Sequence, residues 1–185
     1  MPRATLRVGL HNVNGLSGKL HSLVQQWHAS HFDVVAVVDT HVGFAQRTAV
    51  ELRLMMHGWR SFWCLAYHQG GQDRAGVCIL IKNSLLTSGV IQLKGEPQPA
   101  ASVGPAQGRI LRLPVQWGRQ VIDLVAVYLH ASNVPATLAI INGPLQHIAA
   151  MAPQDGLLML GDFNFVHNTC LDRRGVVAPE ALADS

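Results

Sequence analysis

The chain has 185 residues, of which 49% are hydrophobic and only 14% are charged. This length suits one domain with a sizeable core, and the composition excludes a disordered chain. The formal net charge of +3 fits an anionic partner, but no lysine- and arginine-rich run occurs, so the fold must assemble any basic surface from residues such as Lys19, Arg47, Arg74, Arg173 and Arg174.

Runs of apolar and β-branched residues predict strands along the whole chain. In chain order these cover 6–10, 34–38, 59–67, 77–81, 87–93, 109–115, 121–128 and 157–162. Apolar residues at helical spacing predict helices over 18–30, capped by Ser17, over 44–56, ended at Gly58, and over 136–150, kinked or restarted at Pro144. Residues 68–74 and 95–108 are expected to be loops, and a turn near Trp117 makes 109–128 a hairpin.

This order of elements predicts an α/β fold in which sheets pack face to face with helices on the outside. The apolar runs 34–38, 121–127 and 157–160 are expected to be central strands buried on both faces. No repeat or linker divides the sequence, so residues 1–185 are expected to belong to a single domain.

The cysteines and the long uncharged stretch exclude other classes of protein. Cys64, Cys78 and Cys170 are odd in number and widely spaced, which indicates neither a disulfide framework nor a tight zinc site. No signal-peptide pattern is present, so we expect an intracellular location, the nucleus included. The uncharged stretch 124–154 carries polar residues and prolines, whereas a membrane span needs about 20 predominantly apolar residues. No membrane association is therefore expected.

Polar residues follow the ends of four of the predicted strands. Strand ends converge at the edge of a sheet, where loops carry chemistry, so these residues could share one pocket. Asp162 and Asn164 are two positions apart, and in extended chain they point the same way. A carboxylate and an amide can together hold a water or a metal beside a phosphate. The four clusters are His11-Asn12-Val13-Asn14-Gly15, Asp39-Thr40-His41, residues 128–133, and Asp162-Phe163-Asn164. Asn14, His41 and Tyr128 belong to the first three of them.

Each of these residues also has an ordinary structural interpretation. Asn and Asp are common turn formers, which applies to Asn12, Asn14 and Asp162. Asp39 with Thr40 could cap the following helix. Tyr128 could be a half-buried strand residue. It is the combination of clusters that favours a functional site.

Several motifs, taken in order, resemble those of the endonuclease/exonuclease/phosphatase superfamily. The sequence is most similar to the apurinic-type endonuclease domain of LINE-type (non-LTR) retrotransposons, and the resemblance covers about residues 6–173. The motifs are Asn12-Val13-Asn14-Gly15-Leu16, Val38-Asp39-Thr40-His41, Arg74-Ala75-Gly76-Val77, Val127-Tyr128, and Gly161-Asp162-Phe163-Asn164 followed by Leu171-Asp172-Arg173.

The resemblance implies a DNase I-like fold, a four-layer α/β/β/α sandwich of two mixed sheets. It also implies divalent-metal-dependent hydrolysis of phosphodiesters, with DNA as partner, by a nicking endonuclease of a retroelement. Mg²⁺ or Mn²⁺ would be the cofactor, since such ions take oxygen ligands and offset charge on the phosphoryl group.

The same resemblance implies roles for individual residues. Asp39 would hold the metal with support from Asn12, and Asp162 would orient or deprotonate the attacking water. Tyr128 and Asn164 would hydrogen-bond the phosphate oxygens. The residues expected at the phosphate or at the rim of the site are Asn14, His41, Asp172 and Arg173.

The sequence departs from the family pattern in three places. Asp39 stands where glutamate is usual, which shortens its reach by one carbon–carbon bond, about 1.5 Å. Leu129 and His130 replace a small residue and a proline. No counterpart of the Ser-Asp-His segment with the catalytic histidine is found, so the domain is expected to be truncated at its C-terminus. A catalytically silent remnant with at most weak nucleic-acid binding is therefore a second hypothesis, and a phosphatase or sphingomyelinase activity remains open.

Overall fold

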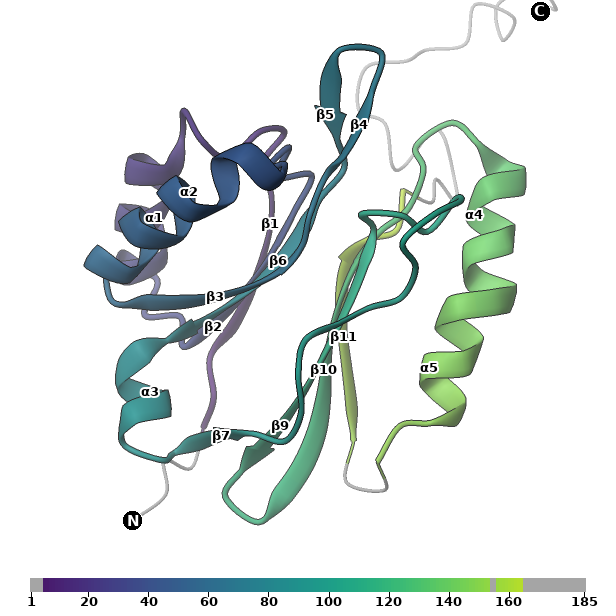
Figure 1. The fold of residues 1–185 in the computed structure, drawn as a ribbon. Coiled ribbons are helices and arrows are strands. Elements are labelled where there is room, and N and C mark those ends of the chain that lie inside the picture. The colour runs from purple at the N-terminus through teal and green to yellow at the C-terminus, as the bar shows by residue number, and fades with distance from the viewer. Residues whose placement is uncertain (1–4, 154–155, 165–185) are drawn as a thin grey trace, which may run out of the picture.

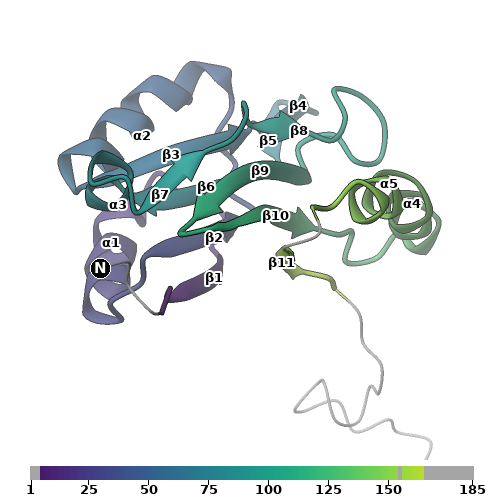
Figure 2. The same cartoon turned by 90° about the horizontal axis from the view of Figure 1, so that it is seen from below.

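The computed structural model describes residues 5–153 and 156–164. Two β-sheets lie face to face in the middle of the molecule, with helices on both outer sides (Figure 1, Figure 2). Each sheet contains both parallel and antiparallel pairs. The predicted four-layer sandwich of two mixed sheets is confirmed.

The first sheet has the strand order β1-β2-β6-β3. Parallel β1 and β2 are joined through helix α1, and helix α2 connects β2 to β3, so both helices cover the outer face of this sheet. The bounds are β1 Val8–Asn12, α1 Leu20–Ala29, β2 Val34–Val38, α2 Phe44–Met56, β3 Trp59–Cys64 and β6 Val77–Lys82.

The second sheet has the order β11-β10-β9-β7, with β8 pairing with β9 off this path. A continuous helical segment, α4, the π-helical turn η1 and α5, covers its outer face (Figure 1). Parallel β10 and β11 are joined through this segment. The bounds are β7 Ile91–Leu93, β8 Gln98–Pro99, β9 Ile110–Trp117, β10 Gln120–Tyr128, α4 Val134–Ile140, η1 Ile141–Leu145, α5 Gln146–Ala150 and β11 Leu157–Asp162.

The central strands are apolar throughout because each of their faces lines a different core. In β2, Val35 and Val37 pack against the helices, whereas Val34 and Ala36 pack between the sheets. β10 divides its side chains in the same way between the inter-sheet core and the core under α4 and α5. Because successive side chains point to opposite faces of a strand, the central strands connect the three cores. The close packing of these cores fixes the positions of the strand ends.

Several local predictions differ from the structure. Residues 68–74 form a hairpin, β4 Tyr67–Gln69 and β5 Gln72–Arg74, turned by Gly70 and Gly71 at positive φ. The strand expected over 87–93 begins later, at Ile91, because the short helix α3 Asn83–Thr87 and a turn through residues 88–90 precede it. Ser17 does not cap α1, because a turn through residues 17–19 delays the helix and Lys19 is its N-cap.

The strand β11 is also less buried than predicted. It lies at the edge of the sheet formed by the described residues, and its side chains are half-buried. Leu158 and Leu160 still pack into the inter-sheet core, and Met159 packs toward the outer helices. Among residues 5–153 and 156–164, no helix has the length and apolar character needed to cross a lipid bilayer.

Candidate active site

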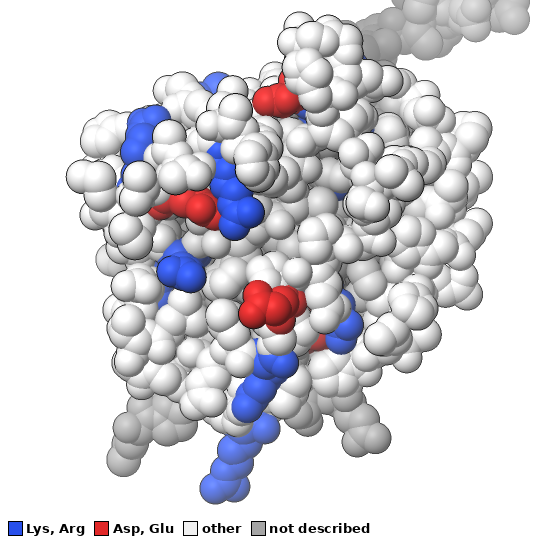
Figure 3. Space-filling view, in the orientation of Figure 1, with Lys and Arg blue, Asp and Glu red and all other residues white. Residues whose placement is uncertain are grey.

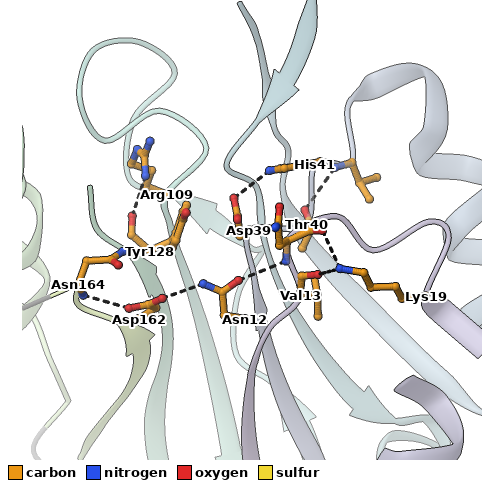
Figure 4. A network of polar contacts seen from close by, with 12 residues as sticks. Asn12, Val13, Lys19, Asp39, Thr40, His41, Arg109, Tyr128, Asp162 and Asn164 are labelled. Carbon is orange, nitrogen blue, oxygen red and sulfur yellow. Dashed lines mark hydrogen bonds and ion pairs between the residues drawn. The ribbon is translucent and has the colours of Figure 1, made fainter. Parts of the chain in front are cut away.

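Four strand ends meet at one edge of the sandwich (Figure 4). Asn12 ends β1 and Asp39 follows β2, while Tyr128 ends β10 and Asp162 ends β11. Each sheet contributes one parallel pair, in which Asn12 lies opposite Val38 and Tyr128 lies opposite Asp162. Side chains that the sequence separates by more than a hundred positions are thereby brought together at the carboxyl ends of parallel strands.

A hydrogen bond joins the two sheets at this edge. The Asn12 Nδ2 donates to Asp162 Oδ2 at 2.7 Å, and the Asn14 backbone N–H donates to Asn12 Oδ1 at 3.2 Å. Lys19 Nζ donates to the carbonyls of Val13 and Asn14 at 2.6 and 2.9 Å. Lys19, expected to belong to a basic surface, thus holds the turn that carries Asn12 and Asn14.

Asn164 orders the loop after β11. Its backbone N–H donates to Asp162 Oδ1 at 3.0 Å, and its Nδ2 donates to the Leu129 carbonyl at 2.8 Å. One N–H of this amide is therefore used within the protein, and one remains for a ligand. Both Asp162 oxygens accept a hydrogen bond from a fixed donor, so the orientation of the carboxylate is set by the fold.

Asp39, His41 and Tyr128 form the other half of the site. His41 Nε2 lies 3.0 Å from Asp39 Oδ1, and the Asp39 side chain is 12% exposed. Burial first, then the charge of Asp39 and a hydrogen bond to it, raises the pKa of Tyr128 to about 12, although Arg109 opposes this shift. The phenol therefore keeps its proton at neutral pH and acts as a hydrogen-bond donor.

The backbone is strained where these residues lie. Among the described non-glycine residues, positive φ occurs at Asn14, Asp39, His41 and Asn164, and elsewhere only at His31 and Ala75. Left-handed backbone is uncommon for such residues and is retained where the surrounding fold enforces it, often at functional sites. The helix-cap interpretation of Asp39 and Thr40 is wrong, because Gly43 is the N-cap of α2.

Arg109 is a site residue that sequence reasoning missed. Its Nη1 donates to the Tyr128 carbonyl at 3.3 Å, and its guanidinium carbon lies 5.1 Å from the centre of the Tyr128 ring. A single arginine at the start of a predicted strand gives no indication in the sequence that it will contact Tyr128. It arises because the preceding loop returns to the site, with the Arg109 N–H donating to the Ala106 carbonyl at 3.1 Å.

Only some of the residues predicted to form a basic surface are free to bind an anion. Arg47 pairs with Glu51 at 2.8 Å, and basic and acidic side chains are interspersed on the face shown in Figure 3. Arg74 lines a pocket of about 790 Å³ together with Asp39, Arg109 and Tyr128. Asp172, Arg173, Arg174 and Cys170 lie outside the described residues.

The donor atoms at this edge suit a hard divalent cation. Asp39 and Asp162 offer carboxylate oxygens and Asn12 offers an amide oxygen, which are ligands typical of Mg²⁺ and Mn²⁺. No group of three or more His, Cys, Asp or Glu side chains with metal-binding geometry occurs in the part of the chain that the structure describes. Any ion held here would therefore keep several waters.

Comparisons with known proteins show which sequences and folds this chain is similar to. No model of a protein family matches the chain. Over 167 residues it is 26% identical to the RNA-directed DNA polymerase from mobile element jockey of Drosophila melanogaster, covering 90% of this chain and 16% of that protein. TDP2 of D. rerio, complexed with a single strand DNA product, matches with a TM-score of 0.63 at 18% identity, over 89% of this chain and 62% of that one.

An AP endonuclease from Archaeoglobus fulgidus matches with a TM-score of 0.62 at 16% identity, over 86% of this chain and 58% of that chain. The chain therefore has the fold of the endonuclease/exonuclease/phosphatase superfamily, as its motifs indicated. Its sequence is distantly similar to a retroelement protein, of which it spans about a sixth of the length.

Proposed function

We propose that this chain carries the metal and phosphate site of a phosphodiesterase that nicks DNA, and that it derives from a retroelement. The observation that supports this proposal most strongly is the Asn12–Asp162 hydrogen bond, which joins both sheets at the edge where Asp39 and Tyr128 lie. The similarity to the jockey protein favours the retroelement branch over a phosphatase or a sphingomyelinase.

Each side chain of the site would have a different role in the reaction. Asp39 and Asn12 would hold Mg²⁺ or Mn²⁺, which supplies positive charge against the phosphoryl oxygens and the leaving oxygen. Asp162 would orient and deprotonate the attacking water, since both of its oxygens are held in place by fixed donors. Tyr128 would donate a hydrogen bond to a phosphate oxygen, and the free N–H of Asn164 would do the same.

The proposal is tested by incubating the chain with supercoiled plasmid in the presence and absence of Mg²⁺. Mg²⁺-dependent conversion to the nicked circle, abolished by a chelator, is the expected result. A second candidate function is weak binding of nucleic acid without cleavage. Metal-independent nicking would contradict the first proposal. DNA binding without any cleavage would favour the second.

Metal binding gives a readout that does not depend on cleavage. Asp39→Asn is expected to weaken Mn²⁺ binding at least tenfold, about 1.4 kcal/mol, measured by isothermal titration calorimetry. Asparagine tolerates the left-handed backbone that Asp39 adopts, so the change removes charge and leaves the turn intact. Glu51→Gln, a carboxylate lost from the surface of α2, is the matched control and should bind as the unmodified chain does. Equal affinity in both variants would exclude Asp39 as a ligand.

The protonated state of Tyr128 predicts the form of the pH–rate profile. Because the pKa of this phenol is raised to about 12, the hydroxyl should stay protonated throughout the neutral and mildly alkaline range. Tyr128→Phe should lower the nicking rate by about 10- to 100-fold, the loss of one hydrogen bond to a charged group. It should not change the pH dependence of that rate. An ionisation below pH of about 10 that disappears in the variant would show that the phenolate takes part instead.

A further inference from the structure

Within residues 5–153 and 156–164, Arg109 is a buried cation without an acidic partner. Its side chain and backbone together are 7% exposed, and its Nε is buried with no hydrogen-bond partner in this part of the chain. The one side-chain hydrogen bond of its guanidinium goes to the Tyr128 carbonyl, and no carboxylate among the described residues forms an ion pair with it. By contrast, the partly buried Arg112 pairs with Asp123 at 2.7 Å. Burying a charge without compensation is costly, so a functional counter-ion is expected for Arg109.

The pocket beside Arg109 offers a place for that counter-ion. It has a volume of about 790 Å³ and runs from Asp39 and Tyr128 to the hairpin β4–β5, which projects above both sheets (Figure 1). Of the residues that the structure describes, Asp39 is the one acid that lines it, against two arginines, Arg74 and Arg109. The other lining side chains near the hairpin are mostly polar, such as Gln69 and Gln107. A cationic, polar pocket of this kind suits an anion better than an apolar ligand.

Arg74 reaches the same pocket from a different element. It is the last residue of β5, is exposed, and pairs across the hairpin with Tyr67. The middle residue pair of this hairpin, His68 and Asp73, is also joined through its side chains, whose Nδ1 and Oδ1 atoms lie 3.0 Å apart. His130 lies in the pocket too, but burial and the charge of Arg109 lower its pKa, so it adds little positive charge at neutral pH. The two arginines are therefore the cations of this pocket.

We propose that Arg109 and Arg74 form a subsite for a phosphate that neighbours the scissile one, so that the substrate is a DNA strand with consecutive phosphates. This inference rests on the proposed function, because Tyr128 and the metal ion held by Asp39 would hold the scissile phosphate next to Arg109. Guanidinium N–H groups form charge-assisted hydrogen bonds with phosphate oxygens, which the Nη groups of Arg109 and Arg74 could supply. A phosphomonoester or a single-phosphodiester headgroup would leave this subsite empty.

Binding of DNA without metal tests the subsite separately from catalysis. The probe is a short fluorescent single-stranded oligonucleotide, followed by anisotropy in EDTA across a series of salt concentrations. Each phosphate contact with a single strand contributes about 0.7 to the slope of log affinity against log salt concentration. Arg74→Gln and Arg109→Gln should each lower that slope by about this amount and weaken binding. Arg119→Gln, the same change in the exposed turn between β9 and β10, should leave both unchanged.

The outcomes separate this inference from the proposed function. Arg74 is exposed, so its variant folds irrespective of any structural role of Arg109. If both variants bind DNA with the affinity and slope of Arg119→Gln, the subsite is wrong, even if the chain nicks plasmid. If both lower the slope while no Mg²⁺-dependent nicking is seen, the subsite holds and the proposed nicking activity fails.

Discussion

Asp162→Asn is expected to lower Mg²⁺-dependent nicking by about 10²- to 10⁴-fold, the usual contribution of a general acid or base. An amide keeps the size and shape of the carboxylate but cannot take a proton from water. The change should leave the fold nearly unaffected, since the amide oxygen can still accept from Asn12 or from the Asn164 N–H. The initial rate of plasmid nicking, at equal enzyme concentration, is the measurement.

A carboxylate removed from elsewhere on the surface serves as the control for this loss. Glu51→Gln changes an exposed ion pair with Arg47 on α2 and should retain the full nicking rate. Thermal unfolding of both variants shows whether any loss of rate reflects loss of structure. A rate for Asp162→Asn within about threefold of the control would mean that Asp162 is not the general base, since that role contributes at least about 10².

Parts of the fold could be predicted from the sequence because the signals were local and strong. α2 was predicted at 44–56 and β11 at 157–162, and the structure gives Phe44–Met56 and Leu157–Asp162. The helix ends where Gly58 adopts positive φ, and the strand is a continuous apolar run. The two short strands beside the Gly70–Gly71 turn are mostly polar and show no alternation of apolar residues, so the sequence did not distinguish this hairpin from a loop.

The site was harder to predict, because its contacts join distant parts of the chain. The motifs indicated which strand ends would carry polar residues, but not that Asn12 would bond to Asp162 across the sandwich. The burial of Arg109 depends on the path of the 95–108 loop, where Gly108 at positive φ lets the backbone pass close to the Leu65 carbonyl. Such contacts follow from the packing of two sheets and leave no trace in local periodicity. The roles assigned to the site residues remain predictions.

Gly161, which precedes Asp162, is expected to be important for the stability of the fold. A Cβ at position 161 would clash with the Val127 carbonyl oxygen and would lie 2.9 Å from Val127 Cβ and 3.1 Å from its carbonyl carbon. These are mostly backbone atoms of β10, the strand paired with β11, and they cannot move aside without breaking the sheet. Gly161→Ala should therefore lower the free energy of unfolding by about 2–3 kcal/mol, in the range of an overpacked core.

Urea unfolding followed by tryptophan fluorescence measures this loss, with the free energy taken by linear extrapolation to water. Gly18→Ala is the matched control, because a Cβ at Gly18 meets no atom within 4 Å, and its effect should stay within about 0.5 kcal/mol. Since Val127 precedes Tyr128, a displaced β11 would also separate Asp162 from Tyr128. Gly161→Ala should for this reason lose DNA nicking even under conditions where it remains folded. Equal stability of the two variants would show that β10 and β11 are not held as closely at Gly161 as the sheet register requires.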